Sequence, residues 1–437
     1  MLNAARPGAA ALTAALAAAL LAGTAAPALA DTPGATAPGT GSAPAAATPE
    51  GLYGKSDPVY DGVWRQSLAL TALTAAKVTP ADSAVAWLTG QQCADGGWPS
   101  YRADASAACD ARTEDSNATA VAVQALVALG GHREAVDKGV QWFRTNQNPD
   151  GSWAYNPGNP GDANSTGLAV NALLAAGTDP AGVAKAGKNA FDGLALFQLG
   201  CAAPADQRGA FVYQPAPDGT AAEANGLASG QASLAAAGGR LPVTNTNRTD
   251  AAPKALTCAD GATGAVPRAD SGEAAGAYLA TRLAAGEQHL MLTLPGAAPT
   301  PDYTATAWAA LGLVQGGHPQ QAAGAVDWLA KEGGGWTKGG TDAAATATLL
   351  LVAQAAQRDP ASFGGTDLVG QLTALGPAPR ATGAASTAAS GPASASAPAK
   401  KEKDSDTGKF WMLGIGLLIG IGGGLVLSLQ RKRGPKL

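Results

Sequence analysis

The stretch Gln92-Cys-Ala-Asp-Gly-Gly-Trp98 recurs as Gln147-Asn-Pro-Asp-Gly-Ser-Trp153, with every shared residue displaced by 55 positions. The match extends upstream, where Trp87 and Trp142 stand at the same offset. In both copies the motif follows a segment with helical spacing and supplies the glycine that ends it. A repeat of this length, with helices alternating with such turns, predicts stacked helical hairpins.

Apolar spacing and helix-stop signals divide residues 51–375 into six pairs of helices, and no strand is expected. Prolines such as Pro80 and Pro319 stand at expected starts, and the pair Gly130-Gly131 stands at an expected end. The expected helices cover residues 64–77 with 81–92, 116–129 with 133–147, 164–176 with 180–198, 222–237 with 271–285, 304–314 with 319–331, and 342–357 with 360–375.

The two helices of a pair differ in character. Residues 119–126 of a first member are small and apolar all round, which is typical of a helix buried on every side. Residues 133–140 of a second member place charges between apolar positions, as expected for a helix with one solvated face. Six inner and six outer helices predict an all-α fold, an (α/α)6 toroid.

These motifs resemble the QW repeat of the terpenoid cyclase and protein prenyltransferase superfamily, which is an α/α toroid. The resemblance covers about residues 60–375 and is clear in the first two copies. Later copies decay, since Phe211 replaces the repeat Trp and the segment ending at Trp336 lacks the Gln. The superfamily also contains extracellular cobalamin carriers and thioester proteins, so the resemblance implies a fold without fixing a function.

The catalytic motifs that the resemblance implies are missing from the sequence. Triterpene cyclases protonate substrate with Asp-x-Asp-Asp-Thr-Ala, whereas residues 114–120 read Glu-Asp-Ser-Asn-Ala-Thr-Ala. The chain has no Asp-Asp pair, its three His are scattered, and Ala285 stands where a thioester would need Cys. We therefore expect a non-catalytic secreted member of the superfamily, with no catalytic residue, no cofactor and no metal.

The inner helices begin with polar residues whose backbone amides and positive dipole ends would converge on one end of the toroid. This pattern predicts a site for a polar or anionic group of a small ligand. Each acidic residue is equally explained as a helix cap. The expected ligand-binding residues are Trp64, Asp115, Asn117, Thr119, Asn164, Thr166, Asn225, Tyr303, Thr304 and Asp342.

The two ends of the chain predict export and anchoring. Residues 1–30 have the pattern of a signal peptide, and 31–50 and 376–409 read as Ala-, Pro- and Ser-rich linkers. Residues 410–429 are long and apolar enough for a transmembrane helix, and the basic tail 430–437 belongs in the cytoplasm. The 51–375 domain would then lie outside a bacterial cell membrane that the chain spans once.

Within that apolar segment, Gly416, Gly420 and Gly424 share one helix stripe, which would let a second membrane helix approach closely. A membrane partner such as a transporter is one reading. The other is that Gly is simply frequent in membrane helices.

The cysteines and the net charge indicate the compartment of the protein and the class of partner it can bind. Four Cys in an exported chain predict disulfides, and of the three possible pairings we favour Cys93–Cys109 and Cys201–Cys258. The net charge of −4, with many basic residues gathered at the C-terminal end, leaves an acidic domain and argues against nucleic acid.

The leading hypothesis is a membrane-anchored extracellular protein that binds a small ligand without catalysis. Resemblance to the cobalamin carriers suggests a corrinoid-like nutrient, although their second, β-rich domain has no counterpart in this sequence. One alternative is a degenerate isoprenoid cyclase, or a glycan-acting enzyme that uses Asp115 and Asp342. A further alternative is a cell-surface scaffold for protein interactions.

Overall fold

The computed structural model describes residues 49–215, 222–244, 247–294 and 296–381. Contacts divide the chain into Met1–Ala45 and Ala46–Leu437, and every described residue lies in the second unit. The predicted signal peptide, the apolar segment 410–429 and its glycine stripe lie outside the described residues. Among the residues described, no helix is long and apolar enough to cross a membrane.

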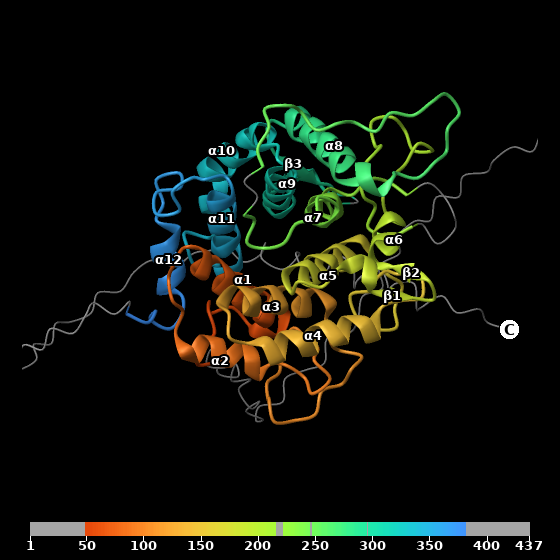
Figure 1. The fold of residues 1–437 in the computed structure, drawn as a ribbon. Coiled ribbons are helices and arrows are strands. Elements are labelled where there is room, and N and C mark those ends of the chain that lie inside the picture. Colours follow the sequence, from red (N-terminus) through yellow and green to blue (C-terminus); the bar gives the residue numbers. More distant parts are fainter. Residues whose placement is uncertain (1–48, 216–221, 245–246, 295, 382–437) are drawn as a thin grey trace, which may run out of the picture. The chain divides into compact units, whose positions relative to one another are not determined.

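Six helices form an inner set: α1 (Pro58–Ala75), α3 (Ser116–Leu129), α5 (Ala163–Ala175), α7 (Gly226–Ala236), α9 (Tyr303–Gln315) and α11 (Ala343–Ala355). Each packs against the next, and α11 packs against α1, so the six close into a ring (Figure 1). Most of their residues are buried, as their small apolar composition predicts.

The outer set is α2 (Asp82–Gly90), α4 (Arg133–Asn146), α6 (Ala190–Ala195), α8 (Ser271–Ala285), α10 (Pro319–Trp336) and α12 (Leu368–Ala374). Each packs on the inner helix that precedes it in the chain. In α4, Val136, Trp142 and Phe143 are buried while the charged residues face solvent. The described residues thus hold twelve helices in a mostly helical arrangement, consistent with the α/α toroid expected from the sequence.

Three expectations were wrong: one helix over 180–198, one helix over 360–375, of which only Leu368–Ala374 is helical, and the absence of strands. Residues 180–198 are not one helix: they form the 3-10 turn η1 (Pro180–Gly182), the hairpin of β1 (Ala184–Lys185) and β2 (Lys188–Asn189), and the short α6. Positive φ angles at Ala186 (50°) and Gly187 (79°) make the two-residue turn of that hairpin. A second hairpin, β3 (Leu290–Leu292) with β4 (Thr300–Asp302), leads into α9, and η2 (Arg268–Asp270) leads into α8.

The repeat motif ties neighbouring hairpins together. The side-chain amide of Gln92 donates to the Gly96 carbonyl of its own turn and to the Ala135 carbonyl of α4. Gln147 repeats this with Gly151 and Val183. At Gly96, where φ is 105°, an added Cβ would overlap a backbone oxygen of α4, so only glycine fits this close approach.

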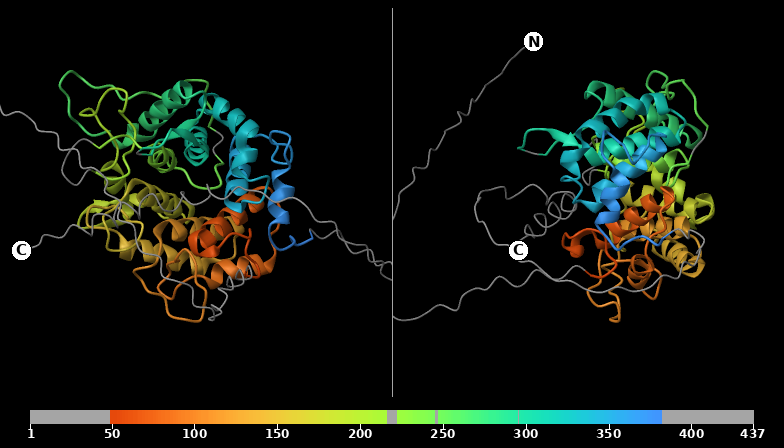
Figure 2. Two further views of the ribbon diagram at one scale, coloured as in Figure 1. Left: turned by 180° about the vertical axis from the view of Figure 1, so that it is seen from behind. Right: turned by 90° about the vertical axis from the view of Figure 1, so that its left-hand side faces the viewer.

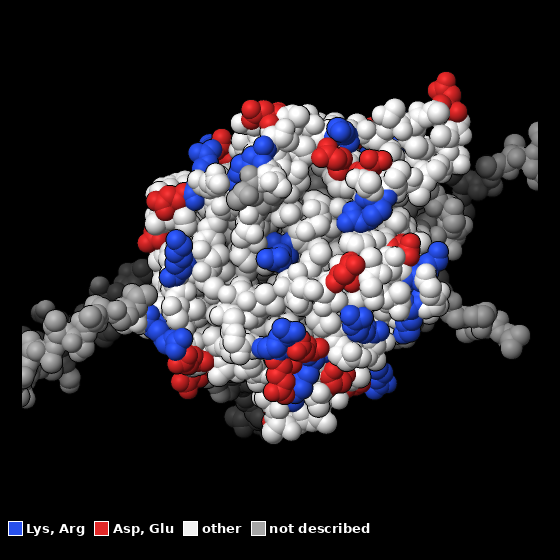
Figure 3. All heavy atoms as spheres, viewed as in Figure 1, with Lys and Arg blue, Asp and Glu red and all other residues white. Residues whose placement is uncertain are grey.

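The segment after α7 crosses the C-terminal end of the ring. Its Leu241 amide donates to Gln124 of α3, and Asn171 of α5 donates to the Gly239 carbonyl. Further along, Arg248 donates to the last turn of α11. Figure 2 shows this green segment and the teal β3–β4 hairpin on opposite sides of the ring. On the face that Figure 3 views, basic and acidic side chains are interspersed.

Candidate functional site

Every inner helix begins with an Asp or Asn cap that accepts a backbone N–H of the first turn. We call these helix starts the cap rim, defined by Asp57, Asp115, Asp162, Asn225, Asp302 and Asp342. Because side-chain oxygens already occupy several first-turn amides, the cap rim presents acceptors and few free donors. This arrangement disfavours the anionic group that the sequence suggested and favours a ligand that brings its own donors.

Two of the expected ligand residues are fully buried and hold the repeat turns. The hydroxyl of Thr119 accepts the Trp98 backbone N–H at 2.9 Å, and that of Thr166 accepts the Trp153 N–H at 3.0 Å. Ser229 does the same for Phe211 in the third copy. The hydroxyls are therefore engaged in joining each turn to the next inner helix.

Asp115 is the centre of a polar network at the start of α3. One carboxylate oxygen accepts the Asn117 and Ala118 amides at 2.7 and 3.0 Å, and the other accepts the Ser100 hydroxyl at 3.1 Å. The Ser100 hydroxyl in turn lies 3.5 Å from the Tyr155 hydroxyl. Burial raises the pKa of Asp115, and its hydrogen bonds oppose that rise.

The next helix start repeats this chemistry. Asp162 accepts the backbone N–H and the hydroxyl of Ser165, and burial raises its pKa to about 6. Burial and then the charge of Asp162 raise the pKa of Tyr213 to about 12. Burial also raises the pKa of Tyr155, with the charge of Asp115 as the next cause.

Tyr155 and Tyr213 were missed by the sequence reasoning. They are 43% and 38% exposed, so they present phenol rings to solvent between the starts of α3, α5 and α7. Each stands two residues after a repeat aromatic, Trp153 or Phe211. Their recurrence at this spacing in two repeat turns is the signal that could have identified them.

The first turns of α3 and α5 carry the two expected asparagines. The side-chain oxygen of Asn117 is buried and accepts no hydrogen bond from the described residues. At the equivalent position of α5, Asn164 donates to Gln231 of α7 at 2.5 Å. Asn117 therefore has an unused acceptor beside the cap-rim residue Asp115, and a donor on a ligand would satisfy it.

Two tryptophans meet across the interior of the ring. The rings of Trp64 on α1 and Trp308 on α9 lie 6.4 Å apart, although α1 and α9 are not neighbours in the ring. Trp308 is 1% exposed, whereas Trp64 is partly exposed. Trp64 thus presents a partly exposed apolar ring inside the circle of inner helices.

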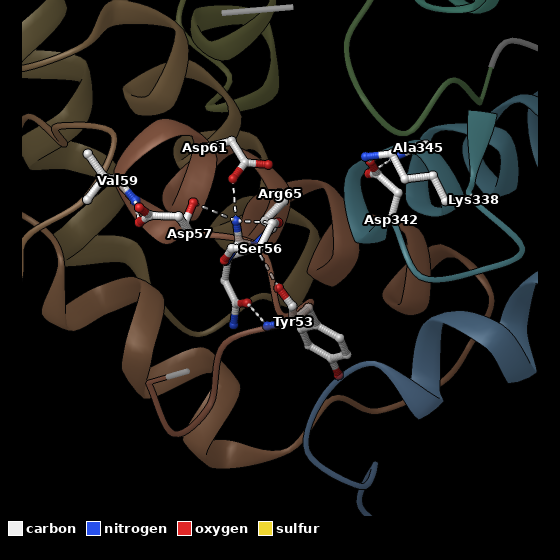
Figure 4. A network of polar contacts seen from close by, with 10 residues as sticks. Tyr53, Ser56, Asp57, Val59, Asp61, Arg65, Lys338, Asp342 and Ala345 are labelled. Carbon is white, nitrogen blue, oxygen red and sulfur yellow. Dashed lines mark hydrogen bonds and ion pairs between the residues drawn. The ribbon is translucent and has the colours of Figure 1, made fainter. Parts of the chain in front are cut away.

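Figure 4 shows the side of the cap rim between α1 and α11. The buried guanidinium of Arg65 donates to the Tyr53 carbonyl and pairs with Asp61. Across from them, Asp342 caps α11 through the Ala345 amide and pairs with Lys338 at 3.2 Å. Burial raises the pKa of Asp61, and Arg65 opposes that rise. Asp342 is therefore a paired cap.

The remaining expected residues lie at the starts of α7 and α9. Asn225 caps α7 by accepting the Ala228 amide, and Thr304 is partly exposed. Tyr303 sits between two rings of α10, Trp328 at 4.8 Å and Trp336 at 5.9 Å. The Tyr303 ring is therefore packed against the aromatic side chains of α10.

Two pockets lie away from the expected ligand residues. One of about 520 Å³ is bordered by Thr74, Pro80, Leu129 and His132, at the C-terminal ends of α1 and α3. The other, of about 220 Å³, lies beside Arg358. Neither is lined by any of the ten expected ligand residues.

Comparison with known protein families supports the resemblance inferred from the repeat motif. The first two copies of the motif and the start of α3 all fall inside a match to one protein family. Residues 51–161 match the squalene-hopene cyclase C-terminal domain. The resemblance to the terpenoid cyclase superfamily is confirmed over these residues, where the cyclase-like Glu114–Ala120 segment lacks the paired aspartates.

No curated protein matches this chain. A solved structure described as a crystal structure of a protein from Actinoplanes is similar at 15% identity. That similarity covers 71% of this chain and 95% of the other, with a TM-score of 0.44. At that score it carries no argument about function.

Proposed function

We propose that this chain is an extracellular binding protein, held at the membrane by residues 410–429, that captures a small ligand at the cap rim without catalysis. The observation that carries the proposal is the buried, unused oxygen of Asn117 beside the Asp115–Ser100–Tyr155 network. A buried acceptor without a partner is costly, and a bound ligand removes that cost.

The chemistry of the cap rim favours a ligand rich in hydrogen-bond donors. Capping carboxylates, the Asn117 oxygen and the phenol of Tyr155 all accept hydrogen bonds, whereas the first-turn amides are largely used. Trp64 adds an apolar surface. Amide side chains on a large apolar ring system meet both requirements, which supports a corrinoid-like nutrient as the first ligand to test.

Binding without turnover is supported by how the two candidate acids are used. Both oxygens of Asp115 accept hydrogen bonds from its own helix start and from Ser100. Asp342 caps α11 and pairs with Lys338. Carboxylate oxygens that accept helix-cap and side-chain hydrogen bonds are already occupied, which supports a structural role for both residues.

The disulfides support a position outside the cell, and the glycine stripe supports a partner in the membrane. The pairs Cys93–Cys109 and Cys201–Cys258 are both disulfides in the structure, as the sequence predicted, and disulfides persist in oxidising compartments. The glycine stripe of residues 416–424 would allow contact with a membrane transporter, to which the ligand would be delivered.

Isothermal titration of the full-length protein in detergent, with cyanocobalamin as the probe, tests this proposal. We expect saturable binding that Asn117→Ala weakens at least about tenfold, since one buried hydrogen bond is lost. Asn159→Ala, in an exposed loop, is the matched control and should bind like the wild type. No binding by folded wild-type protein would overturn the corrinoid assignment, and equal weakening by both variants would overturn the site.

A further inference from the structure

Glu114 is a buried carboxyl beside the first repeat turn. Its side chain is 1% exposed, yet it caps no helix. The cap residue after it, Asp115, recurs as Asp162 at the next inner helix, and the position equivalent to Glu114 is then Gly161. Burying a carboxyl costs free energy unless the group is hydrogen-bonded or paired. We therefore asked which neighbours of Glu114 could use this carboxyl.

The surroundings of Glu114 place it beside a disulfide. A carboxylate oxygen of Glu114 and the Sγ atoms of Cys93 and Cys109 all lie within 4.8 Å of one another. The two sulfurs are bonded together, so they are not free to hold a metal. The indole N–H of Trp142 donates to Oε2 of Glu114 and fixes the carboxyl in this position.

The two sulfurs differ in access. Cys93 is 4% exposed and lies under the repeat turn, whereas Cys109 is partly exposed on the surface loop that follows. An incoming thiolate can therefore reach the Cys109 sulfur, which would make Cys93 the leaving group in the interior. A buried thiolate is unstable without a proton or a positive charge nearby.

We propose that Cys93–Cys109 is a thiol–disulfide exchange site in which Glu114 supplies the proton to the departing Cys93 sulfur. The co-reactant is a small thiol. Its thiolate attacks Cys109, the S–S bond breaks as a new S–S bond forms between the small thiol and Cys109, and the electron pair passes to Cys93. The carboxyl proton of Glu114 moves to the Cys93 thiolate, leaving a carboxylate and a thiol.

The electrostatics of the carboxyl suit this step. Burial raises the pKa of Glu114 to about 7, with Trp142 opposing the rise and Asp95 adding to it. Asp110 is the other acidic neighbour, and Lys138 of α4 packs on the adjacent turn. A carboxyl with this pKa holds a proton near neutral pH and can still release it, as a general acid must.

The second disulfide provides an internal control. Cys201 and Cys258 are both partly exposed, so thiols reach them at least as easily. Among the described residues they form no comparable cluster with a carboxylate or imidazole. A change at Glu114 should therefore affect exchange at Cys93–Cys109 and leave Cys201–Cys258 unaffected.

The test uses the full-length oxidised protein with reduced glutathione from pH 5.5 to 8.5. Acid quenching, alkylation and peptide mass spectrometry give a separate rate for each disulfide. We expect Glu114→Gln to slow exchange at Cys93–Cys109 at least about tenfold near pH 7, because general acids contribute that much or more. Per mole of glutathione thiolate, the wild-type rate should fall as pH rises past about 7, and the variant rate should stay flat.

Three results would overturn the proposal. One is an unchanged rate at Cys93–Cys109 in Glu114→Gln. Another is equal slowing at both disulfides, which would indicate a general change in folding. The third is glutathione attached mainly to Cys93. Glu114→Asp keeps a proton donor and should recover part of the rate, which separates the acid from a purely structural role.

Discussion

Replacing Glu114 with Gln should change how stability depends on pH. Burial raises the pKa of Glu114 from 4.5 to about 7 in the folded protein. Below pH 4.5 the residue is protonated in both the folded and unfolded states. Between 4.5 and 7 the folded protein keeps a proton that the unfolded chain has released, so the free energy of unfolding falls as pH rises. Above about 7 the loss is complete.

The size of this loss in unfolding free energy follows from the pKa shift of Glu114. A difference of about 2.5 pKa units corresponds to about 3–4 kcal/mol at about 1.4 kcal/mol per unit. Gln keeps the size of the side chain and an oxygen that can accept the Trp142 indole N–H, but it carries no charge at any pH. The variant should therefore lack this loss of stability.

Urea unfolding of the oxidised protein at pH 4 to 8 measures the effect, with the m-value checking that the denatured state is unchanged. Buried Asp162 also titrates in this range, so the informative quantity is the wild type minus Glu114→Gln difference at each pH. It should fall by about 3–4 kcal/mol from pH 4 to 8. Asp95→Asn should make the fall smaller and end it at a lower pH, because Asp95 adds to the raised pKa of folded Glu114. A difference that stays constant, or rises with pH, would refute the reasoning.

Two further predictions concern the repeat turns. Thr166→Val should cost about 1–3 kcal/mol in urea unfolding, because a buried backbone N–H of the turn loses its acceptor. Thr281→Val, at an exposed helix position, should cost under about 0.5 kcal/mol, and equal costs would contradict this role. Gly151→Ala should lower the melting temperature more than Gly158→Ala: both glycines have positive φ, but only at Gly151 would a Cβ overlap the backbone of the next hairpin. Similar losses at the two sites would show that the close approach does not matter.

The parts of the fold predicted well from sequence are those where local and long-range signals agree. Residues 116–129 and 271–285 are helices with the expected bounds, since caps and apolar content point the same way. Both disulfide pairs are as expected: Cys93–Cys109 closes a short loop across the first repeat turn, and Cys201–Cys258 spans 57 residues of a long excursion. The repeat Gln joins neighbouring hairpins through two carbonyls, as a joint between repeats should.

Residues 180–198 show why the rest could not be predicted. Pro180 suggested a helix start, but Ala186 and Gly187 adopt positive φ and turn the chain into a hairpin. A non-glycine residue in that conformation leaves no clear mark in composition. The hairpin β3–β4 was missed for a related reason: its strands have three residues each, too short to show alternation.

At the candidate site, the sequence predicted the polar start of each inner helix but not the hydrogen bonds of each side chain. Asp115 and Asp342 were weighed as caps or ligand contacts, and both are caps in the structure. Thr119 was expected at the ligand and instead holds a turn, because its partner lies 21 residues earlier in the chain. Pairings of that range depend on how repeats stack, which a single repeat does not encode.

Mass spectrometry of small molecules that copurify with the full-length protein tests the central claim, binding at the cap rim, most directly. The protein would be extracted from its native membrane without added ligand, alongside the Asn117→Ala and Asn159→Ala variants. We predict one donor-rich small molecule, present with the wild type and Asn159→Ala and lost with Asn117→Ala. No bound molecule in folded wild-type protein, or the same molecule retained by Asn117→Ala, would contradict the account.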